Sequence, residues 1–148
     1  MIWKPNVTVA AVIEQAGKFL FVEENTTDGI RFNQPAGHFE PDESILQAVI
    51  RETLEETAYH FKPDALLGIY HWHNAEKSIT YLRFAFTGTI TGHDADRPLD
   101  KGIIRALWLT PEEMRAKQQL TRSPLVLNCM NDYLAGARYS LDILTHYG

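Results

Sequence analysis

The sequence predicts an α/β domain of the α+β type, with helices on both sides of a mixed, largely antiparallel sheet. Its 148 residues have the length of one domain, and a hydrophobic content of 45% suffices for a buried core. The expected order is strands, a helix, strands and then two helices, which differs from the regular alternation of a doubly wound fold. We therefore expect a single domain over residues 1–148.

The first half of the chain is expected to form two strands, a long loop and a helix. Residues 7–13 and 18–24 are rich in strand-forming side chains, and the short segment 14–17 favours a hairpin between them. Residues 25–37 are rich in turn-forming side chains and long enough for a functional loop. A helical pattern follows at 44–57.

The second half is expected to form strands followed by two helices. The strands are predicted at 66–72, 78–90 and 103–109. Thr110 is expected to cap the next helix, with Pro111 as its first residue and Glu113 completing a capping box. These signals place a short helix directly after the last strand.

The last helix has both start and stop signals. Ser123 is the expected cap, Pro124 suits the first turn, and Gly136 ends the helix. One face has the spacing of a helix packed on a core and comprises Leu125, Val126, Cys129, Met130, Tyr133 and Leu134. Cys129 is the only cysteine, so we expect a buried small hydrophobe and no intrachain disulfide.

The composition bears on partners and location. A net charge of -5 and a pI of about 5.6 argue against a nucleic-acid polymer as partner, although a phosphate-containing small molecule is compatible with them. No apolar run approaches the length of about 18 residues that a membrane span needs, and the N-terminal segment has no signal-peptide pattern. We expect a cytoplasmic monomer or homodimer without membrane contact.

Three glutamates gather on one side of the predicted helix at 44–57. At about 100° per residue, Glu52, Glu55 and Glu56 fall within an arc of roughly 100°. The opposite side, expected to be buried, comprises Leu46, Ile50 and Leu54. The glutamates repel one another and lie near the unfavourable end of the helix dipole. A bound Mg²⁺ or Mn²⁺ would resolve this conflict.

A solvated acidic face is the alternative interpretation of such a helix. The preceding segment favours a site, because Pro35 and Gly37 form a tight loop that leads into the helix. Gly37 permits close approach of the backbone to a ligand, and a loop carbonyl there can supply another oxygen.

The segment from residue 37 to residue 59 resembles the Nudix box, the signature of the Nudix hydrolase family. The residues in register with this pattern are Gly37, Glu43, Arg51, Glu52, Glu55 and Glu56. The positions that depart from it are Thr53, Ala58 and Tyr59. Ala58 replaces the glycine of the usual helix exit, whereas no departure removes a carboxylate.

Other segments resemble the NudJ-type bacterial phosphohydrolases of this family, at 5–13, 17–24, 32–38, 108–114 and 121–126. The resemblance implies an α/β/α sandwich around a mixed sheet. It also implies Mg²⁺-dependent hydrolysis of phosphoanhydrides in compounds that link a nucleoside diphosphate to another group. NudJ-type members act on nucleoside di- and triphosphates and on the pyrophosphate ester of the thiamine pyrimidine precursor.

The resemblance also implies roles for the motif residues. Glu52 and Glu56 would be the main metal ligands, Glu55 a ligand or base, and Gly37 would offer its backbone carbonyl. Arg51 would hold the glutamates by ion pairing. The remaining motif residue, Glu43, would support the junction of loop and helix, because a regular helix places it about 180° from Glu52.

The general base is left open between two residues. Many family members have an acidic residue shortly before the tryptophan strand, where this chain has Gly102. The nearby acids of that loop are Asp94, Asp96 and Asp100. We rank Glu55 first as the base and Asp100 second.

Three residues are candidates for substrate binding. Arg31 and Arg83 are candidates for contact with substrate phosphates, with a surface ion pair as the alternative for each. Trp72 is a candidate for stacking on a heterocycle, with a core role as its alternative. His71 and His73 share one strand face, but no third metal ligand has matching spacing.

These features support a Mg²⁺-dependent hydrolase of nucleoside di- or triphosphates or a related small pyrophosphate. The alternative is a non-catalytic Nudix module that binds or senses a nucleotide. The complete carboxylate set argues against a sensor, and a purely structural protein leaves that set unexplained.

Overall fold

The computed structural model describes all residues from Met1 to Gly148. Its strands are β1 (Asn6–Val12), β2 (Glu14–Gln15), β3 (Lys18–Thr26), β4 (Gly29–Asn33), β5 (Ala36–His38), β6 (Tyr59–Asn74), β7 (Ile79–His93) and β8 (Ile103–Leu109). Its helices are α1 (Ile45–Thr57), α2 (Pro111–Arg115) and α3 (Leu125–Leu134), with 3-10 helices η1 (Gln118–Leu120) and η2 (Leu141–Ile143). Every predicted strand and helix is present. None of the helices has both the length and the apolar content of a membrane-spanning segment.

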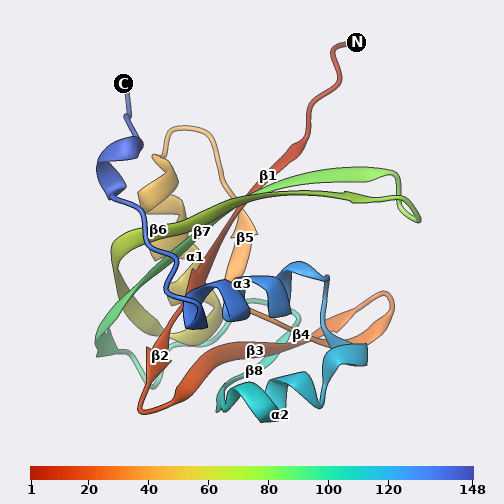
Figure 1. The fold of residues 1–148 in the computed structure, drawn as a ribbon, viewed down its shortest axis with the longest axis vertical. Coiled ribbons are helices and arrows are strands. Elements are labelled where there is room, and N and C mark those ends of the chain that lie inside the picture. The colour runs from red at the N-terminus through yellow and green to blue at the C-terminus, as the bar shows by residue number, and fades with distance from the viewer.

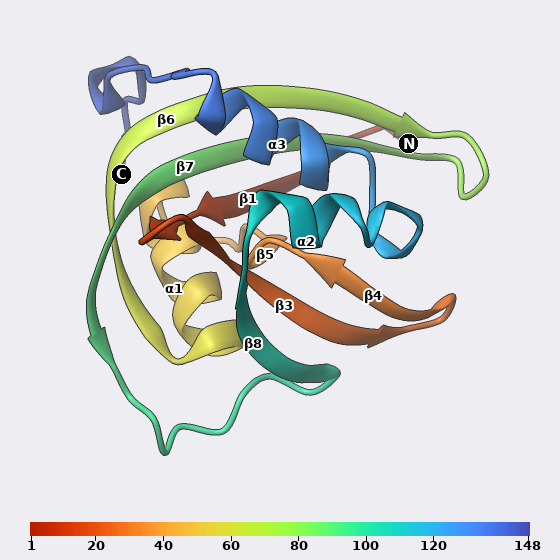
Figure 2. The same ribbon diagram turned by 60° about the horizontal axis from the view of Figure 1, so that its bottom comes forward.

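The strands form two sheets with helices around them (Figures 1 and 2). The first sheet has the order β5-β1-β7-β6, in which β1 runs parallel to β7 and the other pairs are antiparallel. In the second sheet β3 pairs antiparallel with β2, β4 and β8. The predicted α+β fold with mixed, largely antiparallel pairing is confirmed, and the pairing is divided between two sheets.

The predicted hairpin between residues 7–13 and 18–24 is wrong for most of its length. Only β2 pairs with the start of β3, whereas β1 pairs with β5 and β7 in the other sheet. The reason is burial, since Thr8–Val12 of β1 are buried on both faces. Their enclosed backbone N–H and C=O groups therefore need hydrogen-bonding strands on both edges. The predicted loop at 25–37 also contains β4, which forms a hairpin with β3.

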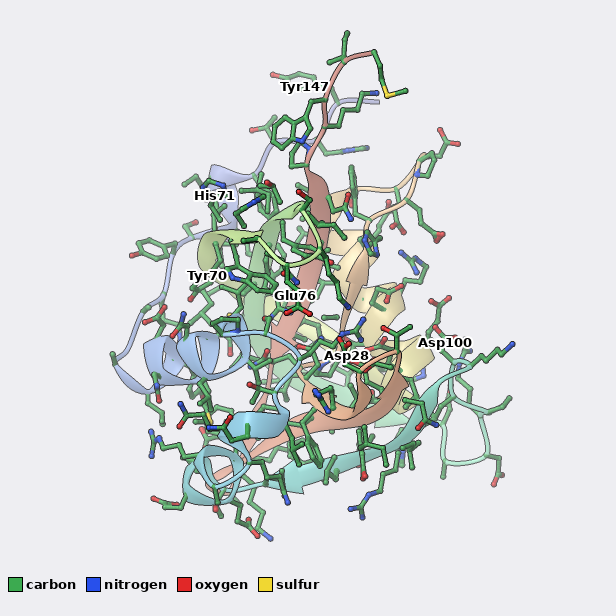
Figure 3. The ribbon with its side chains drawn as sticks, turned by 90° about the vertical axis from the view of Figure 1, so that its right-hand side faces the viewer. Asp28, Tyr70, His71, Glu76, Asp100 and Tyr147 are labelled. Carbon is green, nitrogen blue, oxygen red and sulfur yellow. The ribbon has the colours of Figure 1, made fainter.

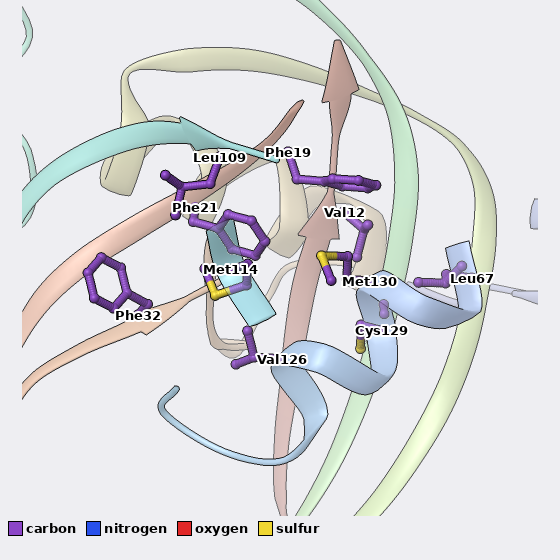
Figure 4. Close-up of a cluster of buried hydrophobic side chains, with 11 residues drawn as sticks. Val12, Phe19, Phe21, Phe32, Leu67, Leu109, Met114, Val126, Cys129 and Met130 are labelled. Carbon is purple, nitrogen blue, oxygen red and sulfur yellow. The ribbon is translucent and has the colours of Figure 1, made fainter. Parts of the chain in front are cut away.

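Two apolar clusters lie on opposite faces of the first sheet. The cluster beneath α2 and α3 comprises Val12, Phe19, Phe21, Phe32, Leu67, Ala85, Leu109, Met114, Val126, Cys129 and Met130 (Figure 4). The cluster beneath α1 comprises Val9, Ala11, Ile13, Leu20, Ala48, Val49, Phe61, Leu66 and Phe86. Alternate residues of β1 enter the two clusters, as the pleat of a strand requires. This alternation sets α1 and α3 on opposite faces.

The buried face of α1 differs from the predicted one. Ile50 is 38% exposed, and Leu46 and Leu54 are half-buried. The buried residues of this helix are Ala48, Val49, Glu52, Thr53, Glu56 and Thr57. Small side chains let the helix approach the sheet closely, so two of the glutamates are enclosed with the sheet rather than left in solvent.

Both ends of α1 are well defined. Ser44 is the N-cap and forms a capping box with Gln47, since each side chain accepts a hydrogen bond from the other residue's backbone. At the other end Ala58 adopts a φ of 64°, and its N–H donates to the Leu54 carbonyl. Ala58 therefore takes the left-handed conformation that glycine usually supplies at a helix exit.

The later helices begin largely as predicted. Thr110 and Glu113 form the capping box of α2. The Ser123 hydroxyl accepts from the Leu125 N–H at 3.1 Å, although Pro124 occupies the N-cap position of α3. Gly136, with a φ of 90°, follows the end of this helix. Cys129 is buried with three other residues of the predicted face, but Tyr133 is half-buried and Leu134 is 49% exposed.

Candidate active site

A cavity of about 1160 Å³ lies along one end of the first sheet, bounded by α1, the β3–β4 turn and the start of α3. Eight predicted site residues line it: Gly37, Arg51, Glu52, Glu55, Glu56, Trp72, Arg83 and Asp100. Figure 3 labels three acidic residues of its wall, Asp28, Glu76 and Asp100, which come from distant segments. The fold thus assembles one site from residues that are far apart in the sequence.

Arg51 is held by carboxylates on two sides. Its Nε and Nη2 donate to the two oxygens of Glu43 at 3.0 and 2.8 Å, and Nη2 also donates to the His38 carbonyl. Its Nη1 donates to Glu52 and, at 2.9 Å, to Glu55. The hydrogen bonds to Glu43 raise the pKa of the Arg51 guanidinium further above its usual range. Arg51 is therefore a permanent charge that orients two of the three predicted ligands.

Glu43 reaches this cluster from outside the helix. It precedes the N-cap, so the regular helix that placed it 180° from Glu52 does not extend to it. One Glu43 oxygen also accepts from the Glu40 N–H at 2.8 Å. The hydrogen bonds from Arg51 hold the pKa of the Glu43 carboxyl below its usual value. Glu43 thus ties the loop to Arg51, and through it to the glutamates.

Glu52 packs directly against the backbone of Gly37. A Cβ built on Gly37 would lie 1.6 Å from Oε2 of Glu52, so any other residue would displace this carboxylate. Gly37 is set in place by β5, where it pairs with Val9 of β1. Glu52 is 9% exposed, and burial raises the pKa of its carboxyl to about 7 although Arg51 opposes the rise.

Glu56 is buried without a cationic partner. Its Oε1 accepts from the Ala36 N–H at 3.0 Å, and no ion pair involves it. Burial raises the pKa of Glu56 to about 9, and the charges of Glu52 and Glu24 add to the rise. Without a cation nearby, Glu56 therefore keeps its proton at neutral pH.

The residues fit a divalent cation, with one difference from the prediction. No three side chains of the metal-binding types converge in the structure into one ligand set. Arg51 engages one oxygen of Glu52 and one oxygen of Glu55. The donors that remain are Glu52, Glu56 and the backbone at Gly37, an all-oxygen set suited to hard cations. A cation there would offset two buried carboxylates whose pKa values are raised by that burial.

The two candidate bases lie close together. The Asp100 N–H donates to the Glu55 carbonyl at 2.9 Å, which ties the loop before β8 to the end of α1. Burial and then the charge of Glu55 raise the pKa of the Asp100 carboxyl. Asp94 is engaged elsewhere, 2.9 Å from Nε2 of His60, and Asp96 is exposed outside the cavity.

Two of the three predicted substrate-binding residues line the cavity. Arg83 is 6% exposed, and its Nη1 donates to Gln34 at 3.0 Å. Trp72 stacks on Tyr81 with ring centroids 5.5 Å apart. Arg31 does not line the cavity, since its guanidinium donates to the carbonyl of its neighbour Ile30.

The paired histidines lie away from this site. His71 and His73 are exposed on the strand face opposite Trp72, and neither lines the cavity. His73 contacts Thr80 across the β6–β7 pair at 3.0 Å. The strand alternation that brings Trp72 to the cavity turns both histidines away from it.

Several cavity residues escaped the sequence analysis. Arg122 pairs with Glu24 at 2.8 Å, and Lys77 of the β6–β7 turn pairs with Asp28 of the β3–β4 turn at 3.0 Å. Gln34 does not line the cavity but holds Arg83; it is 1% exposed and donates to the Val126 carbonyl at 2.7 Å. The paired residues are 49 to 98 positions apart, so no local spacing signalled them.

Comparisons with known proteins agree with this geometry. The family model described as the NUDIX domain matches residues 3–129. The protein named Phosphatase NudJ from Escherichia coli (strain K12) is 37% identical over 142 residues, which cover 96% of this chain and 92% of that protein.

Solved structures are similar over most of the chain. A NUDIX hydrolase from Nitrosomonas europaea is 58% identical with a TM-score of 0.95, and the match covers 97% of this chain and 98% of the other. A MutT NUDIX hydrolase from Burkholderia pseudomallei has a TM-score of 0.73, and the match covers 88% of this chain and 98% of the other. At 16% identity this likeness shows a shared fold alone. The predicted family and fold are thereby confirmed. The chain belongs to the Nudix hydrolase family and is a Nudix phosphohydrolase, a pyrophosphatase that acts on acid anhydrides.

Proposed function

We propose that this protein is a Mg²⁺-dependent hydrolase of nucleoside di- or triphosphates or of a related small pyrophosphate ester. The observation that carries the proposal is the pair of buried carboxylates, Glu52 and Glu56, beside the close backbone approach at Gly37. Enzymes of this family hydrolyse pyrophosphate bonds in small-molecule substrates. Magnesium, the substrate class and a cytoplasmic location are the finer parts of the proposal.

Each site residue has a proposed task. Glu52 and Glu56, with the backbone carbonyl of Gly37, would hold the cation. When bound, that cation supplies positive charge against the phosphate oxygens and makes an attacking water more acidic. Mn²⁺ is the second candidate, supported by a fold relative from Francisella tularensis that is described as complexed with AMP and a Mn ion.

The residues around the carboxylates position the reaction. Arg51 orients Glu52 and Glu55 through its two Nη1 contacts. Glu55 is the first candidate to accept the proton of the water, since it lines the cavity and is half-exposed. Asp100 is the second, because its raised pKa favours proton uptake at the same end of the cavity.

The substrate is proposed to extend from the carboxylates toward Arg83 and Trp72, which line the same cavity. The thiamine pyrimidine precursor pyrophosphate and the nucleotides both have a ring joined to a pyrophosphate. The carboxylates and Arg83 would face the pyrophosphate, and Trp72 would face the ring. Arg31 was also predicted to bind substrate. It is the weakest of the three candidates because it lies outside the cavity.

A panel of nucleotides and pyrophosphate esters, assayed with Mg²⁺, with Mn²⁺ and with EDTA, tests the proposal. Metal-dependent release of phosphate or pyrophosphate is expected from at least one compound. Glu56→Gln is expected to lose at least about 100-fold in rate, because general-base and metal terms each reach that size. Glu112→Gln, an exposed acid outside the cavity, is the matched control. Tight binding without turnover of any compound would instead establish the nucleotide sensor.

A further inference from the structure

Arg83 differs from the other cations of the cavity in having no carboxylate partner. The lysines and arginines that line the cavity are Arg51, Lys77, Arg83 and Arg122. The other three form ion pairs, whereas Arg83 forms none. It is also 6% exposed. Burying an unpaired charge costs several kcal/mol, so a group outside the chain is the natural counter-ion.

Neutral side chains hold the Arg83 guanidinium in one orientation. Nη1 donates to Gln34 at 3.0 Å and lies 3.9 Å from the sulfur of Cys129, while Nη2 donates to Asn33 at 3.2 Å. Gln34 is itself fixed, because its Nε2 donates to the Val126 carbonyl of α3. The arginine is therefore positioned in advance, without any of its charge being neutralised.

One edge of the guanidinium remains available. Its Nε–H donates to no group of the protein, and one Nη2 N–H is also free. No fully enclosed side-chain nitrogen in the chain lacks a partner, so this Nε–H is not fully enclosed, and Arg83 is one of the residues that line the cavity. Two parallel N–H groups of this kind bind a phosphate in the bidentate manner typical of arginine.

An aromatic pair lies on the same face of the sheet as Arg83. Trp72 of β6 faces Tyr81 of β7, and their rings are inclined by 15°. Tyr81 and Arg83 are two residues apart on one strand and so point to the same face, roughly 7 Å apart along the strand. Both aromatic residues line the cavity. A ring and an anion joined by a short linker can therefore occupy the two positions together.

We propose that Arg83 and the Trp72–Tyr81 pair form a subsite for the phosphate nearest the ring, and that this subsite holds the ring-bearing monophosphate after hydrolysis. The inference rests on the proposed function and deepens it. One water cleaves the anhydride bond of a ring-bearing diphosphate to give the monophosphate ester, inorganic phosphate and a proton. The inorganic phosphate forms at the carboxylate end, and the monophosphate ester stays on Arg83. Binding of this product needs no divalent cation.

Isothermal titration calorimetry in EDTA tests the subsite with AMP, adenosine and inorganic phosphate as probes. The wild type is expected to bind AMP about 10 to 100-fold more tightly than adenosine, the size of one charge-assisted contact. Arg83→Gln should reduce AMP affinity to that of adenosine and leave adenosine unchanged. Trp72→Leu should weaken both. Arg105→Gln, which removes an exposed cation outside the cavity, should change neither.

Equal affinities of the wild type for AMP and adenosine would overturn the inference, and so would an Arg83→Gln variant that retains the preference for AMP. The wild-type comparison decides the matter even where Arg83→Gln fails to fold. Because no metal or turnover is involved, this result is separate from the proposed function. If the protein prefers AMP but hydrolyses no compound, only the proposed function is refuted. If it hydrolyses a compound but does not prefer AMP, only the subsite is refuted.

Discussion

Glu56→Gln should stabilise the metal-free protein at alkaline pH while removing its activity. The substitution keeps the shape of the side chain. It also keeps an oxygen that can accept the hydrogen bond from the Ala36 N–H, which in the wild type reaches Glu56 Oε1 at 3.0 Å. It removes a carboxyl that is 9% exposed and has no cationic partner. The predicted gain follows because ionisation of this carboxyl without a cation opposes folding.

The size of the effect follows from the pKa of Glu56, which burial raises from 4.5 to about 9. Between these values the folded protein holds a proton that the unfolded chain has released. The free energy of unfolding therefore falls as the pH rises through this window. Between pH 5.5 and pH 8.5 the difference between variant and wild type should change by roughly 4 kcal/mol, at about 1.36 kcal/mol per pH unit.

Thermal unfolding in EDTA at pH 5.5 and pH 8.5 measures this difference. The melting temperature of the wild type should fall by about 10 °C more than that of Glu56→Gln, at about 2 to 4 °C per kcal/mol for a domain of this size. Glu112→Gln should follow the wild type. Mg²⁺ at pH 8.5 should raise the melting temperature of the wild type more than that of Glu56→Gln, because the carboxylate is a proposed ligand. Parallel pH profiles in EDTA would refute the reasoning.

Three further substitutions test the supports of the site. Gly37→Ala should lower the rate about 100-fold, because the new alanine Cβ would displace the Glu52 carboxylate by more than a bond length. An unchanged rate would show that Glu52 need not stay in place. Ala58→Gly should stabilise by about 0.5 to 1 kcal/mol in urea unfolding, since its φ is 64°, whereas Ala135→Gly, at a φ of -77°, should not. Glu43→Gln should lower the rate about 10-fold by releasing Arg51, and an unchanged rate would contradict the anchoring role.

The Nudix box shows how far local spacing reaches. Arg51, Glu52, Glu55 and Glu56 cluster because short-range hydrogen bonds define the helix, and the helix then dictates which side chains are neighbours. Their proximity along the helix was therefore predictable from residue types and intervals alone, although the structure does not bring three of them together as one ligand set. The caps of α1 and α2 were legible for the same reason, since capping is a contact across three residues.

Other parts of the site depend on segments far apart in the chain. The helical spacing predicted Leu46, Ile50 and Leu54 as the buried side of α1. In the structure the buried side instead carries Glu52 and Glu56. Hydrophobicity along the helix was a poor guide, because the residues that pack into the core, Ala48 and Val49, lie on the same side of the helix as Glu52 and Glu56. The raised pKa values of both glutamates follow from the burial of that side.

The sequence by itself determined the family, the carboxylate cluster and the helix that carries it, because all three depend on spacing within about twenty residues. Only the tertiary structure decided that Glu52 meets Gly37, that Arg51 engages Glu43 together with Glu52 and Glu55, and that Arg83 has no carboxylate partner. The last depends on Gln34, which is tied to a residue 92 positions away. Whether a charge is paired depends on every element packed around it, and only the folded chain brings those elements together.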